Sequence, residues 1–315
     1  MTERLLLSRT AADLYWLARY VERADSTARL IEMGSRMAMI PGRRSTQEWR
    51  SVAAAAGCLD RFEDPDGITE AAIVRTLILD NENPSSIRAC LERARANGRS
   101  VRTALTIQLW EVLNDGWRKL ELMDPAEALR DLSGVLDWVK LRGSAIRGAS
   151  TSTMLRDDNY VFLGLGGYVE RADMTLRLLD VKSYVLLPEM DVVGGGRDHH
   201  QWTSVLHATG AVRTYHHLYH ADYSPWNIAD FLILSSKFPR SVAFSYAKIL
   251  RCLELLSETH NGEEHACHRT ARDMVVRLKA LKMGEIFRDG LSEFVRGSIS
   301  TTQRLNSEIY EAYHF

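Results

Sequence analysis

The hexapeptide Tyr20-Val21-Glu22-Arg23-Ala24-Asp25 occurs a second time, unchanged, as Tyr168-Val169-Glu170-Arg171-Ala172-Asp173. The two copies lie 148 residues apart (170 − 22). A threonine, an arginine and a leucine follow each copy at the same spacing: Thr27, Arg29 and Leu30, then Thr175, Arg177 and Leu178. An identical motif with matching flanks indicates an internal repeat.

Two further matches support a duplication of the whole unit. Residues 49–57 share a tryptophan, a Ser-Val pair, an alanine and a glycine with residues 202–210, at an offset of 153 (202 − 49). Residues 77–86 share Leu-Ile-Leu, a proline and a serine with residues 232–241, at an offset of 155 (232 − 77). Matches that keep their order while the offset drifts slowly are expected after a duplication with small loop insertions. The predicted halves are residues 1–150 and 151–315.

Helical periodicity dominates both halves. Prolines lie at boundaries, whereas apolar residues recur at steps of three and four in segments rich in Ala, Leu, Arg and Glu. We predict an all-α protein: a helical bundle of two tandem, diverged helical repeats that are related by a pseudo-twofold and packed as one compact unit. The expected helices span residues 10–38, 46–58, 68–79, 84–114, 125–149, 157–186, 200–218, 225–235, 240–258 and 263–313, the last one broken near Gly284 or Gly290.

The repeated motif places carboxylates on a core-facing helix surface. At 100° per residue, Asp25 falls on the apolar stripe, Glu22 and Arg29 flank it, and Arg23 points to the opposite face. Asp25 and Arg29 are four residues apart, a spacing suited to an ion pair. The second copy repeats this pattern with Glu170, Asp173 and Arg177, and with Arg171 on the opposite face. Because a buried carboxylate is costly unless it is paired and hydrogen-bonded, its double occurrence indicates a specific role.

Three interpretations of this motif remain open. The charged residues form a buried ion-pair network that sets helix register, or the two sets line one polar pocket across the pseudo-twofold, or Glu22 or Glu170 transfers protons. In the second copy Gly164, Gly166 and Gly167 stand where the first has Trp16, Ala18 and Arg19. Glycine within a helix indicates close helix approach or room for a ligand. The ligand-pocket candidates are Glu22, Arg23, Asp25, Arg29, Glu170, Arg171, Asp173 and Arg177.

Four arginines recur on one face of the helix expected after Pro84. They are Arg88, Arg95, Arg99 and Arg102, at steps of seven, four and three. The corresponding positions of the second half carry no such stripe. Either these arginines bind an anionic ligand or partner, or they form a solvated face with intrahelical partners such as Glu92.

Histidines cluster in one segment of the second half. Six of the ten histidines fall between His199 and His220, and His216 and His220 share one helix turn. No third ligand has a suitable spacing, so no metal site is predicted; His216 and His220 are weak metal candidates, and His265, Cys267 and His268 are weaker still. Surface histidines or a pH-sensitive loop fit the pattern.

Net charge, apolar run length and cysteine spacing argue against a nucleic-acid-binding polycation, a membrane-spanning protein and a disulfide-rich protein. The formal net charge is −1, so the chain as a whole is no polycation that binds nucleic acid. No apolar run approaches the roughly 20 residues of a membrane span. The four cysteines show no CxxC spacing, which is typical of reduced thiols in a cytoplasmic protein.

Residues 15–25 read YWLARYVERAD, residues 94–102 read ARANGRSVR and residues 231–242 read FLILSSKFPRSV. These three segments resemble the bacterial alpha-E domain family, which is named for its α-helical character and its Glu-Arg motif. The resemblance covers essentially the whole chain; near Asn97, however, the family usually has an acidic residue and an alanine, where this chain has Ala96 and Gly98.

The resemblance implies a role beside other proteins. Family members resemble proteins encoded next to an unusual ATP-grasp ligase and a transglutaminase-like cysteine peptidase. We therefore expect a non-catalytic accessory or binding subunit of an ATP-grasp carboxylate–amine ligase in peptide or amide synthesis or modification. No cofactor is expected on this chain, with ATP and Mg²⁺ on the partner ligase, and self-association into a homo-oligomer is compatible with this role. The alternatives are an enzyme that uses its paired Glu/Asp/Arg clusters or a metal in amide chemistry, and a purely structural scaffold.

Overall fold

Helices make up all the regular structure in the described part of the chain. The computed structural model describes residues 8–39, 46–184, 196–220 and 222–315, and no β-strand occurs among them. The first half contains α1 (Ser8–Ala38), α2 (Thr46–Ala55), η1 (Leu59–Arg61), α3 (Glu70–Ile73), η2 (Val74–Leu79), α4 (Ile87–Ser100), α5 (Ile107–Glu121), α6 (Pro125–Arg130) and α7 (Leu132–Thr153). The second contains α8 (Asp158–Tyr184), α9 (Gly196–Ala208), α10 (Val212–Tyr219), α11 (Pro225–Ile233), α12 (Val242–Thr259), α13 (Ala266–Ala280), α14 (Met283–Asp289) and α15 (Leu291–Tyr313).

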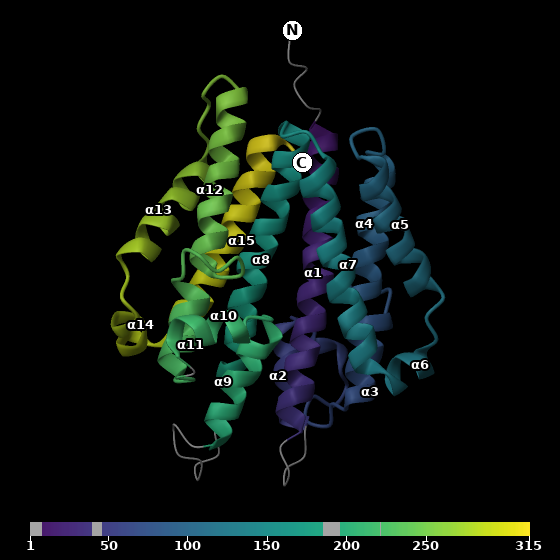
Figure 1. Cartoon of the computed structure of the whole chain (residues 1–315), viewed down its shortest axis with the longest axis vertical. Helices are drawn as coiled ribbons and strands as arrows, with labels where there is room; N and C mark the ends of the chain where they lie inside the picture. Colours follow the sequence, from purple (N-terminus) through teal and green to yellow (C-terminus); the bar gives the residue numbers. More distant parts are fainter. Residues whose placement is uncertain (1–7, 40–45, 185–195, 221) are drawn as a thin grey trace.

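Two long helices, α1 and α8, form the centre of the molecule and carry the two copies of the repeated motif (Figure 1). They run in the same direction, since Tyr15 lies beside Gly166 and Arg23 contacts Glu170. Their backbones approach closely at Gly166, where a Cβ atom would lie 2.1 Å from the Tyr15 carbonyl oxygen. This contact explains why only glycine fits there.

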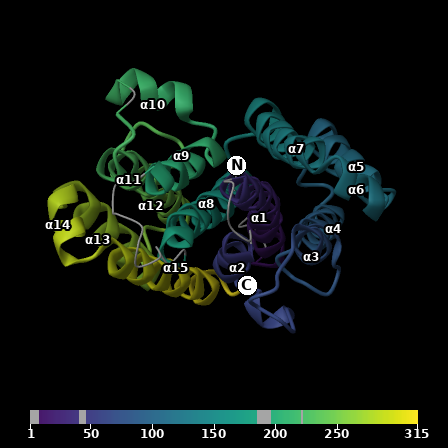
Figure 2. The ribbon, with the colours of Figure 1, turned by 90° about the horizontal axis from the view of Figure 1, so that it is seen from below.

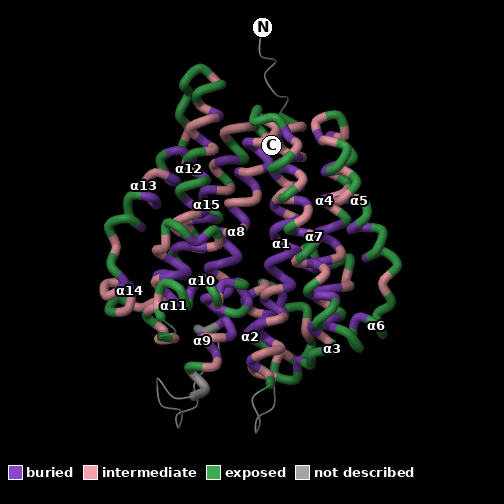
Figure 3. The backbone as a smooth tube through the Cα atoms, viewed as in Figure 1, coloured by how far each residue is buried: buried purple, intermediate pink, exposed green. Residues whose placement is uncertain are grey.

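The remaining helices surround this central pair. Helices α4 and α7 pack on α1, with α5 outside them, and α12 and α15 pack on α8, with α13 outside them (Figure 2). At one end, α2 contacts α8 and α9 contacts α1, so each short helix reaches the long helix of the other half. Buried residues concentrate along α1 and α8, whereas the outer helices are exposed on one side (Figure 3).

Several predicted helices are divided by turns that periodicity does not reveal. The helix expected at 84–114 is two helices, because the chain turns after Ser100 and Thr106 caps α5 by accepting a hydrogen bond from the Leu109 amide. The helix expected at 125–149 is interrupted at Asp131, which caps α7. The predicted break near Gly290 is present, where φ is +104°. None of the helices in the described ranges is long and apolar enough to cross a bilayer.

Candidate functional site

Glu22 lies at the centre of an ion-pair network between α1 and α8. Its side chain is buried and accepts two hydrogen bonds from Arg171, at 3.0 Å from Nε to Oε1 and 2.9 Å from Nη2 to Oε2. Arg147 of α7 and Arg240, just before α12, contact the same carboxylate at 2.9 Å and 3.0 Å. Three helices and one loop therefore converge on this carboxylate.

Glu170 occupies the corresponding place in the second motif, on α8, and its arginine partners both come from α1. Arg23 Nε lies 2.6 Å from its Oε1 and Arg23 Nη2 lies 2.9 Å from its Oε2. Arg19 adds a contact of 2.8 Å to Oε2. Each Glu-Arg pair of the motif thus exchanges partners with the other copy: Arg23 binds Glu170, and Arg171 binds Glu22.

The prediction that Arg23 and Arg171 point away from the core network is therefore wrong. A helical projection gives the direction of the Cα–Cβ bond on one isolated helix. A guanidinium at the end of a long flexible stem can reach sideways to a neighbouring helix. The close approach of α1 and α8 places each carboxylate within that reach.

The aspartates of the motif form the ion pairs that their spacing predicts. Arg29 Nη2 lies 3.3 Å from Asp25 Oδ1, and Arg177 Nε lies 2.6 Å from Asp173 Oδ2. Each arginine also donates to a carbonyl of the other half, Arg29 to Ala208 at 2.8 Å and Arg177 to Ala55 at 3.2 Å. These arginines therefore join the two halves as well as neutralising their own aspartates.

Both glutamates are held as anions. Burial by itself raises the pKa of Glu22, but Arg171, Arg240 and Arg147 together lower this pKa well below its ordinary value. Burial likewise raises the pKa of Glu170, but the positive charges of Arg23 and Arg19 outweigh this effect and lower the pKa to about 2. A carboxyl group with so low a pKa holds no proton to donate near neutral pH and is a weak base.

The network around Glu22 carries excess positive charge. The carboxylates of Glu22 and Asp25 are contacted by four guanidinium groups. The formal charge of this cluster is therefore +2 (4 − 2). Its four arginines are Arg29, Arg147, Arg171 and Arg240.

Three arginines of the network were not among the sequence candidates: Arg19, Arg147 and Arg240. Arg19 is four residues before Arg23, so the two arginines are neighbours on one face of the helix. This spacing is a sequence signal that could have identified Arg19. Arg147 and Arg240 come from α7 and from the turn before α12, far from the motif in sequence. No local spacing relates them to Glu22.

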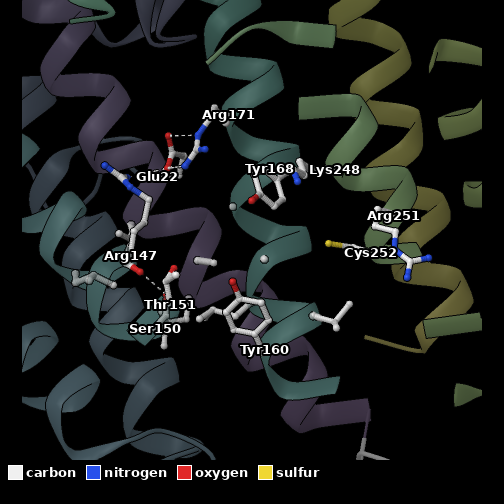
Figure 4. Close-up of a pocket in the computed structure, with 18 of the residues that line it drawn as sticks. Glu22, Arg147, Ser150, Thr151, Tyr160, Tyr168, Arg171, Lys248, Arg251 and Cys252 are labelled. Atoms are coloured by element: carbon white, nitrogen blue, oxygen red, sulfur yellow. Dashed lines mark hydrogen bonds and ion pairs between the residues drawn. The ribbon is translucent and has the colours of Figure 1, made fainter. Parts of the chain in front are cut away.

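A pocket of about 400 Å³ opens beside the Glu22 network, between α1, α7, α8 and α12. Of the eight predicted pocket residues, Glu22 and Arg171 line it, and the other six do not. Figure 4 shows these two with Arg147 at one end of the pocket, the hydroxyl groups of Ser150, Thr151 and Tyr160 at the other, and Lys248, Arg251 and Cys252 along the side. Apolar side chains also line the pocket: Leu17, Val21, Ile146, Leu163 and Leu255. The lining of the pocket thus combines apolar, hydroxyl and charged side chains.

The predicted arginine stripe does not lie on one helix. Helix α4 ends at Ser100, so Arg88, Arg95 and Arg99 belong to it, whereas Arg102 follows in the turn and stacks over the Trp110 ring at 5.5 Å. Arg95 Nε donates to Asn114 of α5 at 2.8 Å. Among the described residues, no carboxylate forms an ion pair with any of these four arginines, so the alternative in which Glu92 pairs with them along the helix is not seen.

The histidine segment forms no cluster of metal ligands among the described residues. His216 directs its Nε2 at the Tyr223 hydroxyl, and His220 ends α10 in a left-handed conformation, with φ +48°. Both histidines are exposed. Tyr223 stacks on buried Tyr215, so His216 lies at the edge of an aromatic group.

A comparison with family models assigns the chain to a family with a Glu-Arg motif. Residues 6–314 match the model of the alpha-E family, described as a predicted alpha-helical domain with a conserved ER motif. The chain belongs to the alpha-E family. In this alpha-E chain the Glu-Arg pair occurs twice, and each pair binds the other.

The related proteins are longer than this alpha-E chain. An uncharacterized protein of Mycobacterium bovis is 26% identical over 183 residues, and one of Mycobacterium tuberculosis is 25% identical over the same length. Each match covers 52% of this chain and 21% of the relative. The matched part is therefore about a fifth of the length of those proteins. No solved structure matches the chain significantly.

Proposed function

We propose that this alpha-E protein is a helical accessory subunit that binds a substrate for an ATP-grasp carboxylate–amine ligase in peptide or amide synthesis or modification. ATP and Mg²⁺ belong to the ligase, and a transglutaminase-like peptidase is a second expected partner. The resemblance to proteins encoded beside such enzymes is the basis for both partners. In the mycobacterial relatives the similar segment is part of a much longer chain, an arrangement that suits a unit acting together with other protein.

The observation that carries the binding role is the state of the repeated carboxylates. Glu22 and Glu170 are buried, anionic and fully engaged by arginines. This arrangement joins α1 to α8 and does not suit proton transfer, which favours a binding role over an enzyme that uses these groups. The pocket beside Glu22 offers a place for a bound molecule.

We also propose that the chain is a duplicated structure, in which the repeats 1–150 and 151–315, centred on α1 and α8, are related by a pseudo-twofold. Pairs of equivalent contacts support it. Thr27 donates to the Ser85 carbonyl and Thr175 to the Arg240 carbonyl, at sequence offsets of 148 (175 − 27) and 155 (240 − 85). Gly57 and Gly210, which are 153 residues apart (210 − 57), share a φ of +69°.

The arginines of α4 are the proposed contact with the partner or with an anionic substrate. Arg99 is exposed, and Arg88 and Arg95 are partly exposed. Guanidinium groups without internal carboxylate partners are available to an acidic surface. We place this function in the cytoplasm, a location compatible with the four free cysteines in the described ranges.

Co-purification with the ATP-grasp ligase tests the partnership. The ligase and this chain are expressed together, one of them is captured by a tag, and ADP release is measured with and without this chain. We expect co-elution and faster ADP release when the chain is present. An R88A/R95A/R99A variant should lose co-elution while it stays folded, and the exposed control R296A should retain it. Failure to co-elute, with ADP release independent of this chain, refutes the partnership.

A further inference from the structure

The pocket beside Glu22 lies where the second copy of the repeat has glycines in place of two large side chains of the first copy. Gly164 and Gly167 line it, and they correspond to Trp16 and Arg19 of the first copy at the offset of 148 (164 − 16). In α1 those two side chains stack on each other, with the Arg19 guanidinium 4.7 Å from the Trp16 ring. The first copy therefore has large side chains at the two positions where the second copy has glycines and an open pocket.

Helix packing does not require these two glycines. At Gly166 a Cβ atom would collide with the Tyr15 backbone. At Gly164 the nearest atoms to a Cβ would be 3.8 Å away, and at Gly167 the nearest would be 4.0 Å away. Each interior glycine costs about 1 kcal/mol relative to alanine. Alanine would fit at both positions and favour the helix, so the physical consequence of glycine there is open space in the pocket.

The walls of the open space are positively charged. Arg147 and Arg171 reach it from the +2 cluster around Glu22, and Glu22 is its sole carboxylate among the described lining residues. Lys248 lines it without a carboxylate partner in the described ranges, and its Nζ lies over the Phe244 ring. Charge of this kind next to low-dielectric apolar walls attracts anions strongly.

We propose that this pocket binds a small molecule with an apolar body and one anionic end, a carboxylate or a phosphate. The apolar body of the ligand lies against the apolar lining residues and the two glycines. Its anionic end lies near Arg147, Arg171 and Lys248. The volume of about 400 Å³ is within the range of small-molecule sites. This ligand class deepens the proposed binding role, but it does not depend on the ligase, because the binding is measured on the isolated chain.

Isothermal titration with three probes tests the ligand class: N-acetyl-leucyl-leucine with a free carboxylate, its C-terminal amide, and octyl phosphate. We expect saturable binding of the carboxylate, of the phosphate or of both, and at least about tenfold weaker binding of the amide. The first two probes tell the two anionic groups apart. Saturable binding of the amide with the affinity of the acid, or no binding of any probe at millimolar concentration, overturns the proposal.

Two pairs of variants locate the binding in the pocket. Lys248→Met should weaken binding of the anionic probe about fivefold or more, whereas Lys279→Met on α13 should not. The double variant G164A/G167A should weaken binding while its unfolding temperature stays the same or rises, and Gly297→Ala, in open space on α15, should bind like the wild type. Wild-type affinity in both Lys248→Met and G164A/G167A refutes the site. If the isolated chain binds the probe but does not speed ADP release by the ligase, the partnership is refuted and the ligand proposal stands.

Discussion

Replacement of Glu170 by glutamine tests whether the repeated Glu-Arg motif is structural. The substitution keeps the shape of the side chain and removes its charge. It leaves the guanidinium groups of Arg19 and Arg23 without their carboxylate, in a site where Glu170 is completely buried. Removal of one partner from a buried ion pair is costly because the remaining charge stays desolvated.

The size of the effect follows from the pKa of Glu170. This pKa falls from an ordinary value of 4.5 to about 2 in the folded protein. A difference of about 2.5 units corresponds to about 3 kcal/mol of folding free energy. Because the folded pKa is the lower one, this stabilisation is fully present above pH 4.5 and is lost as the pH falls through about 2.

Urea unfolding of the wild type and of Glu170→Gln, at neutral pH and at several pH values below 4.5, measures this contribution. We expect the variant to be less stable by about 3 kcal/mol at neutral pH, and the difference to shrink toward pH 2. Glu293→Gln removes the exposed pair with Arg296 and should change stability by at most about 0.5 kcal/mol. A variant as stable as the wild type at neutral pH, or a difference that does not depend on pH, contradicts the structural role.

Three further predictions test other parts of the fold. Gly166→Ala should destabilise the protein by about 1–3 kcal/mol in urea unfolding, because its Cβ would collide with the Tyr15 carbonyl; unchanged stability would contradict the close helix approach. Ser86→Ala and Ser241→Ala should each cost about 1 kcal/mol, because both serines cap helices at equivalent positions, and clearly unequal losses in thermal unfolding would argue against equivalent halves. The Cys90 thiol should react slowly with a thiol reagent near pH 8, because burial raises its pKa to about 12; rapid labelling of the native protein, followed by mass spectrometry, would contradict this.

Local geometry explains what the sequence alone determined. Asp25 and Arg29 form an ion pair because a separation of four residues makes them neighbours on any α-helix. The helical class and the family follow in the same way from periodicity and from the repeated motif, both of which are properties of short segments.

The tertiary structure decided everything that depends on the distance and rotation between helices. Arg23 pairs with Glu170 because α1 and α8 lie close together, and Arg147 and Arg240 join Glu22 from remote segments. The pocket likewise exists because four helices leave space at Gly164 and Gly167. A helical projection describes one isolated helix, whereas these contacts and this space are set by how separate helices pack, which no spacing within a segment encodes.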